Sequence, residues 1–190
     1  MRKIITSLAG AVMLMASLPA VSALAQTSVS GTATLNTGDL ALGTVNPVNF
    51  GAATLTGFGQ TLSTSNVADL RDARGTGGGW RVSIRAIPFG ANTTGLFTNG
   101  SHTLADGSMT VSGGSTSIAP GFWVGTQPVN SDNAYPYPVL TTGATNIFNA
   151  GLNTGLGNGG INFGDALAVP ADAYAGAYST TLAYSLIAGP

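Results

Sequence analysis

The chain has no cysteine, a single histidine and few charged side chains of either sign. The absence of cysteine excludes a disulfide scaffold, a thiolate zinc site and a cysteine nucleophile. One histidine excludes a multi-histidine metal centre, and we expect no cofactor. Six Lys and Arg residues against seven Asp and Glu residues give a formal net charge of −1, which excludes the basic surface that nucleic-acid binding requires.

Charged residues make up 7% of the 190 residues, against about 25% in an average soluble domain. The hydrophobic fraction is nevertheless 44%, which is enough to form a core and is untypical of a disordered chain. Gly, Thr, Ser and Asn are abundant, whereas Lys and Glu, which favour helices, are nearly absent. This composition favours strands and turns over helices.

The N-terminus has the order of features that defines an export signal. Arg2 and Lys3 provide a positive start, residues 4–18 are uncharged and mostly apolar, and an Ala-Leu-Ala sequence at 23–25 provides a small-x-small cleavage site. The apolar run is shorter than the roughly 20 residues that a membrane helix needs. We therefore predict a cleaved signal peptide over residues 1–25, rather than an uncleaved anchor.

The remainder, residues 26–190, is predicted to form one β domain. A chain of this length fits a single domain. No later segment is long and apolar enough to cross a membrane, so we expect no membrane span after cleavage.

Alternation of apolar and polar residues marks two strands clearly. Trp80, Val82 and Ile84 alternate with polar side chains, and the same period is present over residues 177–186. Weaker candidate strands are Ser28–Leu35, Gln60–Leu70, Ser108–Ser112, Ile118–Val124, Val139–Thr142 and Ile161–Val169.

The segments between the candidate strands are rich in Gly, Asn and Pro. Gly75–Gly79 is predicted as a hairpin or a crossover, Asn130–Pro138 as a loop or a sheet edge, and Asn146–Asn158 mainly as a loop. Many strands separated by such turns predict an all-β fold. We expect a single antiparallel β-sandwich, Ig-like or barrel-like, with long Gly/Asn-rich loops.

Four segments occur in a recognisable order. They are LALGTVNPVNFG at Leu40–Gly51, VADLRDARGTGGGWRVSI at Val67–Ile84, FGDALAVPA at Phe163–Ala171 and AGAYSTTLAYSLIAGP at Ala175–Pro190. Together they resemble the WxL domain of bacterial surface proteins, which is named for its Trp-x-Leu motifs. The resemblance implies secretion, an all-β fold and non-covalent attachment to the peptidoglycan-containing cell wall, without catalysis.

Both Trp-x-Leu positions depart from the family pattern, since the first reads Trp-Arg-Val at 80–82 and the second Tyr-Ser-Leu at 184–186. Each keeps a large aromatic and a branched aliphatic side chain two residues apart, and therefore on one strand face. The resemblance makes these residues candidates for wall binding, whereas the alternation favours a place in the core. The four residues concerned are Trp80, Val82, Tyr184 and Leu186.

Two other features invite a functional interpretation. Arg74 could bind a carboxylate or phosphate of a wall polymer, but a turn in which it pairs with Asp69 or Asp72 is favoured. His102 has no G-x-S-x-G motif with which to form a hydrolase triad, so we predict a surface-loop histidine.

The remaining aromatic residues lie outside the family motifs. Trp123 is a candidate for the strand core. The Tyr-Pro-Tyr-Pro sequence at 135–138 is stiff, and it could form either an exposed contact site or a packed loop.

The sequence thus predicts a secreted, non-enzymatic surface protein that associates non-covalently with cell wall polymer, in a structural or adhesive role. Other surface proteins are further candidate partners. The alternative is a self-assembling subunit of a surface layer or filament, because few Lys or Glu residues are present to protect the sheet edges from pairing.

Overall fold

The computed structural model describes residues 30–87, 95–115, 123–131 and 134–190. All regular secondary structure in these ranges is β-strand, which confirms the all-β prediction. Among the same residues, no helix could cross a membrane. The predicted signal peptide lies outside the described residues.

Residues 36–190 form one compact unit, and residues 30–35 belong to a separate one. The described part of that second unit is exposed and contains no strand. The predicted strand Ser28–Leu35 is therefore wrong over residues 30–35. A strand needs a neighbour for its backbone groups, and none of the described strands pairs with this segment.

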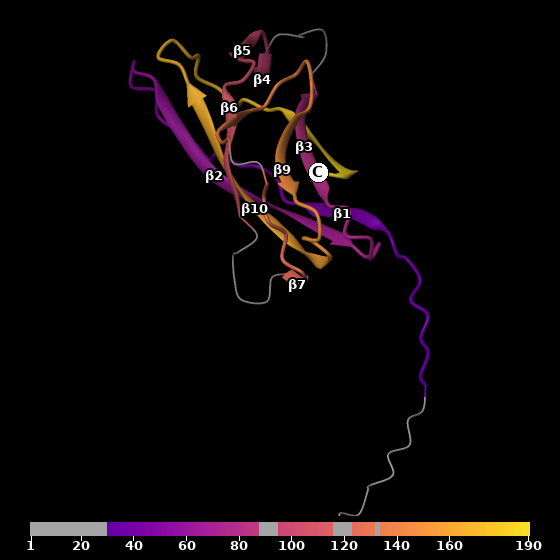
Figure 1. The fold of residues 1–190 in the computed structure, drawn as a ribbon. Helices are drawn as coiled ribbons and strands as arrows, with labels where there is room; N and C mark the ends of the chain where they lie inside the picture. The colour runs from indigo at the N-terminus through magenta and orange to yellow at the C-terminus, as the bar shows by residue number, and fades with distance from the viewer. Residues whose placement is uncertain (1–29, 88–94, 116–122, 132–133) are drawn as a thin grey trace, which may run out of the picture. The chain divides into compact units, whose positions relative to one another are not determined.

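The larger sheet has six strands and the smaller one three, and every pairing is antiparallel (Figure 1). The larger sheet has the order β1-β2-β10-β6-β8, with β7 also paired to β10. Its strands are β1 (Leu40–Val45), β2 (Gln60–Asp72), β6 (Met109–Ser115), β7 (Trp123–Gly125), β8 (Tyr137–Pro138) and β10 (Gly157–Val169).

The smaller sheet has the order β11-β3-β9 and packs against the larger one. Its strands are β3 (Trp80–Ile87), β9 (Thr145–Ala150) and β11 (Thr181–Ala188). A separate hairpin joins β4 (Gly95–Asn99) to β5 (His102–Ala105).

Strands β2 and β10 form the long axis of the larger sheet and pair along their whole length, from Gln60 opposite Val169 to Asp72 opposite Gly157. Along each strand, inward residues alternate with outward ones, as the period of two requires. Figure 1 shows the two strands side by side, with β3 and β9 on one side of them.

The core lies between the two sheets, which confirms the predicted sandwich. Trp80, Val82 and Ile84 of β3 are fully buried, as the alternation predicts. They belong to one hydrophobic cluster with inward side chains of the larger sheet, among them Leu70 and Phe163.

Residues 75–79 form a crossover, because they connect β2 of the larger sheet to β3 of the smaller one. Gly75, Gly77 and Gly79 all have positive φ values, which glycine adopts without steric cost. A Cβ atom at Gly79 would also lie 2.5 Å from the Ala150 carbonyl oxygen. The glycines therefore allow the chain to turn closely against β9.

Strand β9 contradicts the prediction of a loop over Asn146–Asn158. The register of β3 and β9 shifts between Val82 and Ser83, and both Ile147 and Phe148 are buried. This bulge breaks the alternation that would have marked the strand.

Two other predictions of strand position are wrong. Val139–Thr142 contains no strand, and residues 177–180 precede β11 rather than belonging to it. Of the predicted strand Ile118–Val124, residues 118–122 lie outside the described residues.

Candidate functional site

Trp80 is enclosed by other aromatic rings rather than presented to a ligand. Its ring stacks against Trp123 and Phe148, with centroid distances of 6.0 Å and 5.7 Å. Its indole Nε1 donates a hydrogen bond of 3.0 Å to the Gly155 carbonyl oxygen, and the residue is 0% exposed. In this structure the indole face is not available for stacking on a sugar.

The second motif lies directly beside the first. Strand β11 pairs with β3 so that Leu186 is opposite Val82 and Ala188 is opposite Trp80. Val82 is fully buried, whereas Tyr184 and Leu186 are half-buried against the core. The structure therefore brings the four candidate residues together on two neighbouring strands, and Tyr184 and Leu186 of β11 retain some exposure.

The Tyr184 hydroxyl belongs to a polar cluster inside the apolar sandwich. It accepts a hydrogen bond of 2.9 Å from the Asn66 side-chain amide, and its ring lies 6.4 Å from that of Phe163. Burial raises the pKa of Tyr184 well above its ordinary value, and the nearby Asp165 carboxyl raises it further. The hydrogen bond from Asn66 opposes these effects. Tyr184 is thus held as a neutral phenol.

Asp165 lies on the inward face of β10 and is 1% exposed. Neither carboxyl oxygen has a hydrogen-bond partner among the described residues. Burial raises the pKa of Asp165 from 3.8 to about 7, because an ionised carboxylate is poorly solvated there. The carboxyl is therefore largely protonated in mildly acidic solution.

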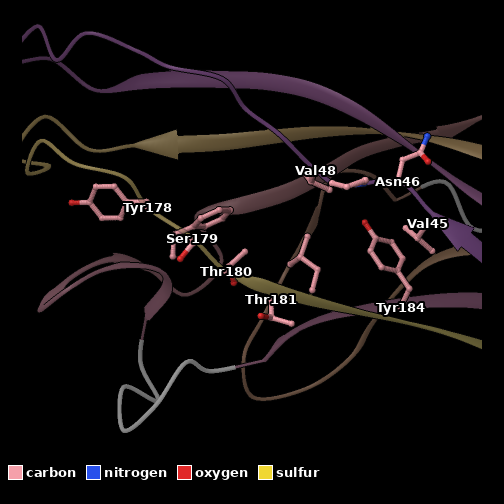
Figure 2. Close-up of a pocket in the computed structure, with 11 residues that line it drawn as sticks. Val45, Asn46, Val48, Tyr178, Ser179, Thr180, Thr181 and Tyr184 are labelled. Atoms are coloured by element: carbon pink, nitrogen blue, oxygen red, sulfur yellow. The ribbon is translucent and has the colours of Figure 1, made fainter.

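A pocket of about 450 Å³ opens beside Tyr184. Figure 2 shows Tyr184 directed from β11 toward the segment that carries Asn46 and Val48. All lining side chains are uncharged, and they combine hydroxyls, one amide, aromatic rings and aliphatic groups. They are Val45, Asn46, Pro47, Val48, Phe97, Tyr178, Ser179, Thr180, Thr181, Leu182 and Tyr184.

Three distant parts of the chain form this pocket. Phe97 of β4 reaches it because the hairpin is joined to the segment before β11 by two backbone hydrogen bonds between Thr98 and Ser179. The segment after β1 is held in place by a backbone hydrogen bond of 2.9 Å, which the N–H group of Asn46 donates to the Val67 carbonyl oxygen. Sequence reasoning identified Tyr184 but missed the rest of the pocket.

Asn66 and Asp165 were also missed, although a signal for them was present. Asn66 lies in phase with the buried Ala68 and Leu70 along β2. Asp165 is in the same phase as Phe163 and Leu167 of β10. A polar residue on the apolar phase of a strand predicts a buried polar group.

Arg74 forms a structural ion pair and is not presented as an anion-binding site. Its Nε and Nη2 atoms donate to the two Asp72 carboxylate oxygens over 2.9 Å and 2.8 Å. Nη2 also donates to the Gly79 carbonyl oxygen at 2.8 Å. The hydrogen bond from Arg74 lowers the pKa of Asp72, although burial opposes this effect. The favoured interpretation, a turn with an internal pair, is confirmed.

His102 contradicts its prediction as a surface-loop residue. It begins strand β5, is half-buried, and stacks on Tyr174 with 3.7 Å between ring centroids and 15° between planes. The described residues contain no group of three or more His, Cys, Asp or Glu side chains that could hold a metal ion.

The Tyr-Pro-Tyr-Pro segment is packed rather than extended into solvent. Tyr135 and Tyr137 are half-buried, and their rings meet edge to face at 4.9 Å. The Tyr135 hydroxyl donates to the Ile147 carbonyl oxygen and accepts a bond of 3.1 Å from Asn130. Packing rather than an exposed contact site therefore describes the two tyrosines, and Tyr137–Pro138 forms the edge strand β8 rather than a loop.

Comparison with known families identifies one match over nearly the whole chain. The family model of the WxL domain, described as a surface cell wall-binding domain, matches residues 23–190. No curated protein and no solved structure matches the chain.

Proposed function

Because the chain belongs to the family of WxL surface cell wall-binding domains, we propose that it is a secreted structural or adhesive component without catalytic activity. The family establishes a surface protein that binds the cell wall non-covalently. In addition to wall binding, residues 1–25 would direct export, and the role would be structural or adhesive, without catalysis.

One observation carries this proposal. Every described strand, from Leu40 to Ala188, lies within the matched residues 23–190, which supports assigning wall binding to the sandwich.

A sedimentation experiment tests the proposal. The protein comprising residues 26–190 is mixed with purified wall sacculi and centrifuged. We expect it to pellet with the sacculi and to be released by denaturant, as a non-covalent association requires. Protein that stays in the supernatant at every sacculus concentration would contradict the proposed function.

A second candidate function, self-assembly into a surface layer or filament, is favoured by strand β11. This strand lies at the edge of the smaller sheet and contains no charged residue over Thr181–Ala188. Charged edge residues normally prevent pairing between sheet edges of different molecules. Sedimentation velocity in buffer at rising protein concentration tests this function, for which growing polymers are the expected result.

A further inference from the structure

The pocket beside Tyr184 is the feature best suited to hold a ligand. We infer that it binds one uncharged sugar unit of the wall polymer, held by hydroxyl and amide groups rather than by charge. This inference rests on the proposed function, since it locates the ligand that a wall-binding domain needs.

The size and lining of the pocket fit this ligand. Its volume of about 450 Å³ lies in the range of roughly 300–1,000 Å³ that small-molecule sites occupy. Rings of Tyr178 and Phe97 provide apolar surface, and exposed Asn46, Ser179 and Thr181 provide donors and acceptors at its wall. A sugar ring presents the same two chemistries, apolar C–H faces and a rim of hydroxyl groups.

Electrostatics distinguish between a neutral and an anionic ligand. None of the lining residues is Lys or Arg, the side chains that normally bind phosphate and carboxylate groups. The Asp165 carboxyl acts electrostatically on Tyr184, which lines the pocket. When Asp165 is ionised it repels an anion. The pocket therefore disfavours phosphate-rich wall polymers and favours uncharged saccharide.

The Tyr184 hydroxyl is oriented for this role by its neighbours. It accepts the hydrogen bond from Asn66, so its own proton can be donated to a ligand oxygen. Burial raises its pKa and keeps that proton in place. Tyr in place of the family's Trp thus puts a hydroxyl group, rather than an indole ring, at the pocket.

The test uses two substitutions that remove one hydroxyl each. Thr181→Val keeps the shape and strand preference of the side chain at the start of β11, and Tyr184→Phe keeps the ring. The matched control is Thr142→Val, at an exposed position that does not line the pocket. Melting temperatures show whether each variant is folded.

Binding is measured by calorimetry with a neutral N-acetylglucosamine tetramer and with poly(glycerol phosphate), and by sedimentation with sacculi. We expect the wild type to bind the tetramer, with little dependence on salt. Each pocket variant should bind it about three- to ten-fold more weakly, the effect of one hydrogen bond. Thr142→Val should bind like the wild type.

The outcomes distinguish failure of the pocket inference from failure of the proposed function. Folded Thr181→Val protein that binds both tetramer and sacculi like the wild type would overturn the pocket inference and leave the proposed function intact. The same holds if the wild type binds sacculi but only the anionic polymer in solution. A wild-type protein that binds none of these probes would contradict the proposed function itself.

Discussion

The buried Asp165 carboxyl makes a stability prediction whose sign and size follow from its surroundings. Its folded-state pKa is about 7, against an ordinary value of 3.8, so the folded protein holds a proton that the unfolded chain releases. The contribution of Asp165 to stability should therefore be greatest below about pH 4, decrease as the pH rises through 7, and level off about one pH unit above the folded-state pKa.

The magnitude follows from the difference of about three pKa units. Each unit corresponds to about 1.4 kcal/mol, so ionisation of Asp165 should lower the free energy of unfolding by up to about 4 kcal/mol between pH 4 and pH 8. Asp165→Asn places a neutral group of the same shape on β10. We expect the variant to match the wild type near pH 4 and to be the more stable protein at pH 8.

Urea unfolding at several pH values, followed by tryptophan fluorescence, measures this difference. Trp80 is fully buried and Trp123 partly buried, so the signal reports on the core. The pKa of Asp72 is lowered in the folded protein, so protonation of Asp72 reduces stability as the pH falls. This effect is the same in the wild type and the variant, and it therefore cancels when the two are compared. A variant less stable than the wild type at pH 8 would refute the reasoning.

Three further predictions concern the core, the crossover and export. Trp80→Ala should lower the free energy of unfolding by about 3–5 kcal/mol and lose sacculus binding through unfolding, and a normal melt with lost binding would instead make Trp80 a ligand contact. Arg74→Ala should lower the free energy of unfolding, measured in urea, by about 3 kcal/mol, because the buried Asp72 charge loses its Arg74 partner. Arg74→Lys should restore only part of this free energy. Mass spectrometry of exported protein should find Gln26 at the N-terminus, and a chain still carrying Arg2 would contradict cleavage.

Strands with strict alternation could be predicted from the sequence. Trp80, Val82 and Ile84 show the period of two without interruption, and all three are buried as expected. Strand β9 could not be predicted, because its bulge places Ile147 and Phe148 in the core in succession. Alternation of apolar and polar residues predicts a strand only where the pairing with the neighbouring strand has no bulge.

The candidate site could be predicted only in part. The motif spacing pointed to Tyr184, because an aromatic and an aliphatic residue two apart share a strand face. Nothing local to residue 184 indicates that Asn66 hydrogen-bonds to its hydroxyl from 118 residues away. Asn46 and Phe97 reach the same pocket from two further segments.

The sequence by itself determined the β class, the sandwich and the family of this protein. Composition and alternation reflect local preferences of the backbone, and the family motifs are patterns along the chain. Only the tertiary structure decided which motif residues are enclosed and which retain exposure. The pairing of β11 with β3 puts Leu186 opposite Val82, while the aromatic stack encloses Trp80 and the pocket opens beside Tyr184. These differences arise from contacts between distant segments, which no local pattern encodes.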